Sequence, residues 1–343
     1  MPISITRRRA LSLAAPALGG LLPFDASWAQ PGSTPGTNPI FVLNSLDANI
    51  SVIDPVTYTE RKRIATGKEP HHLYLTPDEK SLLVANALSN SLTFIDPVTA
   101  EIQRVLPNIT DPYQLRFSAD MKWFVTAANR LDHVDLYHWL PQQTEQPLKL
   151  IKRIPAPKTP SHLYLDSQST VVYASLQDSD ELMAIDLATQ TPRWKIKCGK
   201  MPADLFLTQD NKRLFVGLTG DKVVEVYDVS SPNTAKLIQR ITTGEGAHAF
   251  RAKGDGRHWF VSNRVANTIS LIDTQTSTVV SELPGPSGPD CMEVLAGGKT
   301  LLVSSRWARK LTFIDIEQRK VLRQVNVGRS PHGVWTLDHA PRV

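Results

Sequence analysis

One phrase returns along this chain and limits what the chain can fold into. Its clearest copy is 66–96, TGKEPHHLYLTPDEKSLLVANALSNSLTFID, a Gly-x-x-Pro turn followed by three short apolar runs, the last of which ends on an aspartate. That aspartate recurs at separations of 42, 90, 42, 45 and 42 residues, as Asp54, Asp96, Asp186, Asp228, Asp273 and Asp315. The interval of 90 contains a degenerate copy with His138 in the aspartate position. Several short strands per unit, at a period of about 40–50 residues, are typical of a β-propeller.

The turns that open the innermost strands predict seven blades. They lie at Pro70, Pro112, Pro160, Pro202, Gly246 (in place of proline), Pro289 and Pro331. The first two strands, 40–44 and 50–54, have no such turn before them, and 327–335 supplies the missing piece at the other end of the chain. We therefore expect one all-β, seven-bladed propeller over 40–343, in which the C-terminal strand completes the N-terminal blade. Such closure removes exposed strand edges.

The repeated aspartates have a structural interpretation. Each is followed by a turn sequence, as in Asp54-Pro55-Val56-Thr57, and an aspartate side chain can accept hydrogen bonds from backbone N–H groups two and three residues further on. We expect these residues to cap turns and not to take part in chemistry.

The N-terminal segment has the features of an export signal. Arg7-Arg8-Arg9 precedes an apolar stretch, 11–22, and Ser27-Trp28-Ala29 places small residues at the cleavage positions. The arginines suggest twin-arginine export, although Ala10 stands where phenylalanine is usual, so the general secretory route stays open. We expect residues 1–29 to be a signal peptide, 30–39 a flexible Pro/Gly/Ser/Thr tether, and the mature protein to be periplasmic in a bacterium.

Composition narrows the function classes. Removing residues 1–29 takes away three arginines and one aspartate, so the formal charge falls from +5 to +3, which does not favour nucleic acid as the partner. No apolar run reaches the ~18 residues of a membrane span. Cys198 and Cys291 fall in different predicted blades, which favours free or metal-ligating thiols over a disulfide. A phosphate loop, a Cys-x-x-Cys-His haem attachment, a His-Glu-x-x-His motif and a Gly-x-Ser-x-Gly elbow are all absent from the sequence, which argues against an enzyme.

The repeat resembles the YVTN-type propeller repeat over residues 40 to about 338, most clearly in 66–96, 262–273 and 330–334. Similar propellers include the haem d1-binding domains of nitrite reductases and their maturation factors, metal-binding periplasmic chaperones, surface-layer proteins, nucleic-acid-binding proteins and propellers that support dehydrogenases. The resemblance implies the fold and leaves the function open.

Candidate metal ligands gather where each innermost strand enters the channel. Two positions per blade are concerned, the first and the second residue after the turn. The second residues, one from each of the seven predicted blades, are His72, Gln114, His162, Asp204, His248, Cys291 and Gly333. The first residues are His71, Tyr113, Ser161, Ala203, Ala247, Asp290 and His332. Five of the nine histidines fall on these positions. Imidazole, carboxylate and thiolate are transition-metal ligands, so we predict a metal site among His72, His162, His248, Asp204 and Cys291. The alternative is that these side chains only line the channel.

Arginines form a second candidate set. The sequence predicts equivalent positions for the arginines of Asn129-Arg130, Asn263-Arg264 and Ser305-Arg306, and Arg116 and Arg251 lie on innermost strands. Guanidinium groups bind carboxylates and phosphates with two hydrogen bonds, and aromatic rings stack on planar ligands. We expect an anionic cofactor to be bound by Arg130, Arg264, Arg306, Arg116, Trp307 and His332. The alternative is structural pairing with acids such as Asp132 or Asp178.

These patterns favour an exported, monomeric, non-enzymatic binding or accessory protein. It would hold a transition metal ion or an anionic cofactor such as haem d1 at the channel mouth, and serve a periplasmic partner protein or a cofactor-receiving enzyme. Two alternatives stay open: a metal-dependent lyase or lactonase, and a scaffold that binds a protein or nucleic acid.

Overall fold

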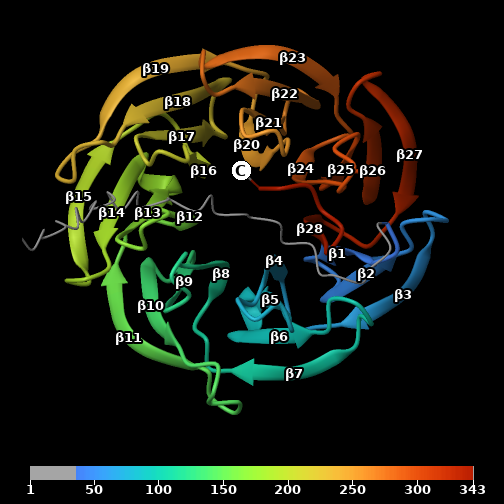
Figure 1. Ribbon diagram of the computed structural model, residues 1–343, viewed down its shortest axis with the longest axis horizontal. Coiled ribbons are helices and arrows are strands. Elements are labelled where there is room, and N and C mark those ends of the chain that lie inside the picture. Colours follow the sequence, from blue (N-terminus) through green and yellow to red (C-terminus); the bar gives the residue numbers. More distant parts are fainter. Residues whose placement is uncertain (1–35, 343) are drawn as a thin grey trace, which may run out of the picture.

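The computed structural model describes residues 36–342, which form a ring of seven four-stranded antiparallel sheets around a central channel (Figure 1). We number the blades along the ring and give the strands of each from the channel outward. Blade 1 contains β28 (Pro331–Thr336), β1 (Ile40–Asn44), β2 (Asn49–Ile53) and β3 (Glu60–Ala65); blade 2 contains β4 (Pro70–Leu75), β5 (Leu82–Asn86), β6 (Ser91–Ile95) and β7 (Ile102–Pro107); blade 3 contains β8 (Pro112–Phe117), β9 (Trp123–Ala128), β10 (His133–Trp139) and β11 (Leu148–Pro155).

The remaining blades follow the same order. Blade 4 contains β12 (Pro160–Leu165), β13 (Val171–Leu176), β14 (Glu181–Asp186) and β15 (Thr191–Lys197); blade 5 contains β16 (Pro202–Leu207), β17 (Arg213–Leu218), β18 (Val223–Asp228) and β19 (Lys236–Thr242); blade 6 contains β20 (Ala247–Ala252), β21 (His258–Asn263), β22 (Thr268–Asp273) and β23 (Thr278–Pro284); blade 7 contains β24 (Pro289–Val294), β25 (Thr300–Ser305), β26 (Lys310–Asp315) and β27 (Lys320–Asn326). Two short 3-10 turns, η1 (Ala87–Ser89) and η2 (Gln177–Ser179), follow β5 and β13.

The two ends of the chain meet in blade 1, which confirms the predicted closure. Strand β28 pairs antiparallel with β1, with Val334 opposite Val42 and Trp335 opposite Phe41. Figure 1 shows the red C-terminal strand beside the blue N-terminal ones. Among the residues that the structure describes, no helix is long and apolar enough to cross a membrane. The expected signal peptide and residues 30–35 of the tether lie outside the described residues.

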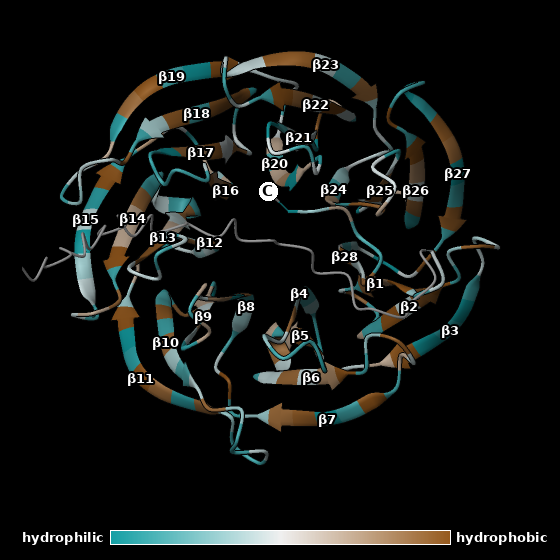
Figure 2. Ribbon diagram, in the orientation of Figure 1, coloured by the Kyte–Doolittle hydropathy of each residue, from teal (hydrophilic) through white to brown (hydrophobic). Residues whose placement is uncertain are grey.

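The core is built between neighbouring blades. Middle strands such as β5 are buried along their whole length, whereas outer strands such as β15 and β27 are mostly exposed, and their hydropathy changes from residue to residue (Figure 2). Aromatic rings bridge the blades: Phe206 of blade 5 stacks on Trp259 of blade 6, with ring centroids 3.9 Å apart. The fold is therefore stabilised by seven repeated faces that pack on one another.

The repeated aspartates cap turns, as predicted. Asp54 Oδ1 accepts hydrogen bonds from the N–H groups of Val56 and Thr57, both at 2.8 Å, and Asp96 makes the same pair of bonds in blade 2. In blade 3 His138 takes this position, and its ring packs against Trp123 at 4.5 Å between centroids.

Two backbone features recur at the entrance of every innermost strand and place the candidate site. The residue before the strand has a positive φ in all seven blades: Glu69, Asp111, Thr159, Met201, Gly246, Gly288 and Ser330. Directly after the first strand residue, the pairing shifts by one, as between Pro70 and Leu73 in β4; the other six innermost strands show the same irregularity. A bulge of this kind redirects side chains. Here it lets two consecutive residues of a strand reach the channel mouth.

Candidate functional site

The pairing register corrects one sequence prediction. In blade 6 Ala247 lies opposite Asn263, just as Pro70 lies opposite Asn86 in blade 2. Ala247 therefore takes the proline position, and Gly246 is the left-handed residue before the strand. His248 is consequently the first residue after the turn and not the second, so it is equivalent to Asp290 and His332.

Five histidines from four blades gather at this mouth. The rings of His71 and His332 pack at a tilt, with centroids 3.7 Å apart, and the His72 ring lies 4.8 Å from that of His332. His162 connects the two sides of the cluster, since its ring is 5.3 Å from that of His72 and 5.4 Å from that of His248. Two overlapping groups have ligand atoms within 4.8 Å of one another: His71, His72 and His332; and His248, Asp290 and His332.

His332 has the arrangement of a metal ligand. Its Nδ1 lies 2.9 Å from the backbone oxygen of His71 and, because a carbonyl can only accept, Nδ1 carries the proton. In the neutral ring Nε2 then presents a lone pair. Nε2 is buried, has no hydrogen-bond partner within residues 36–342, and lies 3.5 Å from Asp290 Oδ1. Two acceptors that face each other across this distance are suited to share a cation. Histidine ligands of metals are commonly held by such a bond from the other ring nitrogen.

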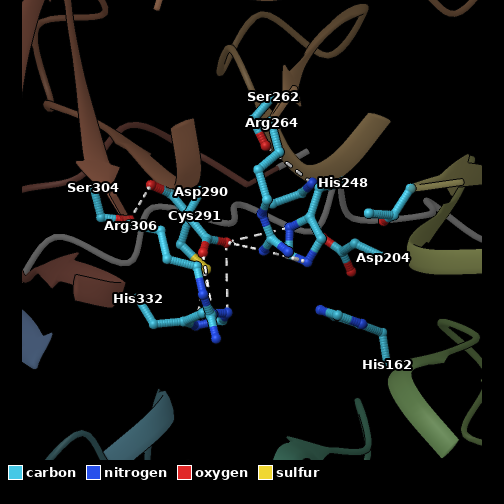
Figure 3. Close-up of polar contacts among 12 residues, drawn as sticks. His162, Asp204, His248, Ser262, Arg264, Asp290, Cys291, Ser304, Arg306 and His332 are labelled. Carbon is cyan, nitrogen blue, oxygen red and sulfur yellow. Dashed lines mark hydrogen bonds and ion pairs between the residues drawn. The ribbon is translucent and has the colours of Figure 1, made fainter. Parts of the chain in front are cut away.

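Asp290 is the centre of the second group (Figure 3). Its side chain is fully buried, and Oδ1 lies 3.2 Å from His248 Nδ1, which has no hydrogen-bond partner in the described part of the chain. Arg264 Nη2 donates to Asp290 Oδ1 at 2.8 Å and to His248 Nε2 at 2.7 Å. Arg306 Nη1 reaches Asp290 Oδ2 at 3.4 Å. One carboxylate thus faces two guanidinium groups and two imidazoles.

The first group is held by the backbone of blade 3. His72 Nδ1 lies 2.8 Å from the carbonyl oxygen of Tyr113 and therefore donates to it, and it is also 2.9 Å from His71 Nδ1. The proton of His71 then belongs on Nε2, which is buried without a hydrogen-bond partner among the described residues. The Tyr113 ring packs on His71 at 3.7 Å between centroids, so it already stacks on a protein ring.

Burial dominates the protonation of the cluster. It lowers the pKa of His72 and of His162 to about 3 and that of His71, His248 and His332 well below the ordinary value. Burial alone would raise the pKa of Asp290, but the neighbouring charges, Arg264 foremost, hold that pKa well below its usual range. At neutral pH the mouth therefore contains neutral imidazoles and an ionised carboxylate, which are the forms that bind metal ions.

The other two predicted metal ligands have different surroundings. Both Asp204 oxygens accept backbone hydrogen bonds at 2.9 Å, from the N–H groups of Leu205 and Phe250, and burial raises the pKa of this carboxyl. Cys291 Sγ lies 3.4 Å from His332 Nδ1, and burial, with Asp290 next, raises the pKa of the thiol well above its usual value. Cys198 and Cys291 are both free thiols, as the sequence suggested.

The arginines do not form the single set that the sequence suggested. Asn263 and Ser305 end β21 and β25, and Arg264 and Arg306 follow them directly. In blade 3, however, Ala128 ends β9, Asn129 follows it directly, and Arg130 is the second residue after the strand. The prediction that Arg130 is equivalent to the other two is therefore wrong. Arg130 instead pairs with Asp111 and Glu69, so the acids proposed for structural pairing, Asp132 and Asp178, were also wrong choices.

The remaining residues of the predicted anion site lie apart from Asp290. Arg116 is deeper in the channel, where its guanidinium carbon is 5.0 Å from the ring centre of Tyr164. Trp307 is 55% exposed at the mouth, and its ring covers Gly288 so closely that a Cβ there would lie 2.6 Å from it. Of the predicted anion-binding residues, the structure therefore brings together only Arg264, Arg306 and His332.

At the far end of the channel, the C-terminal segment contacts the end of β20 opposite to His248, and Figure 1 shows it inside the ring. Arg251, a member of the candidate arginine set, donates there to the backbone oxygens of Ala340 and Pro341 and pairs with buried Glu293. Arg342 pairs with the same carboxylate. This contact separates Arg251 from the histidine cluster.

Two residues of the site were missed by sequence reasoning. Asp290 and His71 stood among the channel-entrance positions but were not chosen, because alternation along a regular strand allows one residue in two to face the channel. The bulge breaks that alternation. A useful signal was available in the unusual Pro-Asp-Cys of β24, which places an acid where the other blades have His, Tyr, Ser or Ala.

A family model described as YNCE-like beta-propeller matches residues 7–342. The chain belongs to this family. The match spans all seven blades, so the YNCE-like assignment covers the whole channel and its mouth. No curated protein matches the sequence significantly.

Solved structures with the same fold share little sequence with this YNCE-like propeller. The periplasmic gluconolactonase PpgL of Pseudomonas aeruginosa is 16% identical, with a TM-score of 0.74 and coverage of 89% of this chain and 99% of that one. A functionally unknown protein from Desulfotomaculum acetoxidans is 16% identical, with a TM-score of 0.74 and coverage of 87% and 98%. Dihydro-heme d1 dehydrogenase NirN, in complex with DHE, is 15% identical, with a TM-score of 0.66 and coverage of 90% and 77%. At this identity the likeness concerns the fold alone.

Proposed function

We propose that this protein is an exported metal-binding propeller that holds a first-row divalent transition metal ion at the channel mouth. His248, Asp290 and His332 are the proposed ligands. The observation that carries the proposal is His332, whose Nδ1 is fixed by a backbone carbonyl and whose buried Nε2 faces Asp290 Oδ1 at 3.5 Å, unpaired within the described range.

The energetics support a ligand at this point. A buried polar atom without a partner costs about 1–3 kcal/mol, and His71 Nε2, His248 Nδ1 and His332 Nε2 are three such atoms among residues 36–342. A metal ion bound between the imidazoles and the carboxylate would give His332 Nε2 a partner, and His248 Nδ1 as well if that ring binds through Nδ1. Two imidazoles and one carboxylate suit Zn²⁺, Fe²⁺, Co²⁺ or Cu²⁺, and they leave coordination positions open for an external group.

The proposal favours a free metal ion over a carboxylated cofactor such as haem d1. The His71 ring packs between those of Tyr113 and His332, with both centroid distances at 3.7 Å, so these rings leave no slot for a planar macrocycle. Arg264 and Arg306, which would hold its carboxylates, already bind Asp290. An absorption spectrum of the protein purified from its native host separates the two ligands, because a haem gives a Soret band and a free metal ion does not.

Metal titration tests the proposal directly. The protein, stripped with a chelator, is titrated with Zn²⁺, Co²⁺, Ni²⁺ and Cu²⁺ by isothermal calorimetry, and the bound metal is counted by elemental analysis. We expect one ion per chain, lost in His332→Gln and in Asp290→Asn. His138→Gln, on the outer part of blade 3, is the matched control and should keep the ion. Stoichiometric binding that survives His332→Gln would refute the ligand assignment.

A metal-dependent lactonase is the second candidate. The observation that favours it is the pair of arginines next to the proposed metal, because a metal ion with open positions can activate water while guanidinium groups hold an anionic substrate. PpgL, which has the same fold, is described as a gluconolactonase. Hydrolysis of sugar lactones that disappears with a chelator and in Asp290→Asn would support this activity.

The proposed site of action is the periplasm. Arg7-Arg8-Arg9, the apolar stretch after them and Ser27-Trp28-Ala29 support export, and PpgL is described as periplasmic. Cell fractionation of the wild type and of a variant with Arg7, Arg8 and Arg9 changed to lysine distinguishes the routes. Twin-arginine export predicts that the variant stays in the cytoplasm, whereas general secretion predicts no change.

A further inference from the structure

Arg264 occupies the position where a metal ion would bind. It directly follows β21, and its side chain is 16% exposed. A single nitrogen, Nη2, lies 2.7 Å from His248 Nε2 and 2.8 Å from Asp290 Oδ1 (Figure 3). Guanidinium nitrogens only donate, so both contacts are accepted by the atoms that would otherwise bind a cation.

We propose that Arg264 is an internal cation that a metal ion must displace, and that its release creates an anion site with Arg306. The proposal rests on the metal-binding function proposed above and deepens it. It makes metal binding and anion binding mutually dependent.

The chemistry of His248 requires the displacement. If the metal binds Nε2, it replaces the Arg264 hydrogen bond directly. If it binds Nδ1, the proton of the neutral ring must move to Nε2, which then faces the Arg264 N–H as a second donor. Either mode breaks the bond between His248 and Arg264, and coordination of Asp290 Oδ1 removes the other partner of Arg264.

The charges then favour an anion. In the described part of the mouth, Arg264 and Arg306 share the one carboxylate of Asp290, while Glu69 and Asp111 are paired with Arg130. A divalent ion on Asp290 Oδ1 displaces Arg264 from this oxygen and adds two positive charges to a mouth in which one carboxylate already faces two guanidinium groups. An oxyanion of the sulfate, phosphate or carboxylate class can bind such a pair through two-pronged hydrogen bonds. By linkage, the anion must raise metal affinity by the same factor by which metal raises anion affinity.

Zinc and sulfate are suitable probes. Zinc affinity is measured by competition with a fluorescent chelator in a chloride buffer, with and without sulfate, for the wild type, Arg264→Met and Lys68→Met. Methionine keeps an apolar stem and removes the charge. We expect Arg264→Met to bind zinc at least tenfold more tightly than the wild type. Sulfate should raise the zinc affinity of the wild type at least threefold. For Arg264→Met the factor by which sulfate raises zinc affinity should be less than half as large.

The control and the alternative outcomes are distinct. Lys68→Met removes a positive charge at the entrance of β4 without touching the histidines or leaving an acid unpaired, and should match the wild type in both measurements. Equal or weaker zinc binding by Arg264→Met, or no sulfate effect on the wild type, overturns the displacement model while the metal-binding function stands. If neither the wild type nor Arg264→Met binds zinc, both the proposed function and this inference are refuted. Should Arg264→Met not fold, Arg264→Gln makes the same test.

Discussion

The buried histidines at the mouth make the stability of the protein depend on pH, and His162 is the residue on which to test this. It is 2% exposed, and burial, reinforced by His332 and Arg264, lowers its pKa to about 3. In the unfolded chain a histidine has an ordinary pKa near 6.5. Below pH 6.5 the unfolded state therefore binds a proton that the folded state does not. The free energy of unfolding therefore decreases as the pH falls from 6.5 toward 3. Above pH 6.5 this histidine does not change it.

The magnitude follows from the shift. Each pH unit between the two pKa values costs about 1.4 kcal/mol per histidine. At pH 4.5, which is two units below the unfolded value, His162 alone lowers the free energy of unfolding by about 3 kcal/mol, a large part of the ~5–15 kcal/mol of a typical protein. His162→Gln removes this titrating group and keeps a polar side chain.

Urea unfolding at pH 7.5 and pH 4.5, with a chelator present, measures the effect. Between these two conditions the wild type should lose about 3 kcal/mol more than His162→Gln does, because the variant lacks this titrating group while the remaining groups are present in both proteins. Ser161→Ala is the control, since it removes only the hydroxyl 2.9 Å from His162 Nδ1 and keeps the ring. Equal losses in the wild type and in His162→Gln would refute the assignment of His162 as a buried neutral base.

Three further predictions concern stability, each measured by urea unfolding at pH 7.5. Asp290→Asn leaves two partly exposed guanidinium groups without their acid, so we expect a loss of about 2–3 kcal/mol, and an unchanged midpoint would contradict the charge cluster. Glu293→Gln leaves the buried Arg251 without its carboxylate and should lower the free energy of unfolding by about 3–5 kcal/mol. Arg342→Ala removes a partly exposed partner of the same carboxylate and should lower it by less than about 1 kcal/mol. A larger loss in Arg342→Ala than in Glu293→Gln would contradict the contact at the far end of the channel. Met201→Gly should stabilise the protein by about 0.5–1 kcal/mol because φ is +50° there, and a loss would show that the methionine side chain outweighs the backbone strain.

The fold could be predicted from the sequence because its determinants are local and repeated. Each blade has its own turn, its own apolar runs and its own capping aspartate, so one degenerate copy with His138 does not hide the period. Closure could be predicted as well, because the N-terminal blade lacked an innermost strand and the C-terminal end contained an innermost strand without the rest of a blade.

The site could be predicted only in part, because it depends on backbone details that the repeat does not encode. The register of blade 6 was off by one because Gly244-Glu245-Gly246-Ala247 contains two glycines and no proline; aligning Gly244 with Gly67 gives the register found. The role of Asp290 depends on a bulge that turns two consecutive side chains into the channel, and on Arg264 from the neighbouring blade 6.

The closure of blade 1 also bears on when the protein can fold during its life. One edge of β1 pairs with β2, and the other edge, toward the channel, pairs with β28. Strand β28 begins almost three hundred residues later, at Pro331. While the ribosome is still making the chain, blade 1 has an unpaired strand edge, and the mouth lacks His332. The ring can be completed only after nearly the whole chain has left the ribosome. A nascent or truncated chain that ends before Pro331 therefore has neither a closed ring nor the proposed metal site.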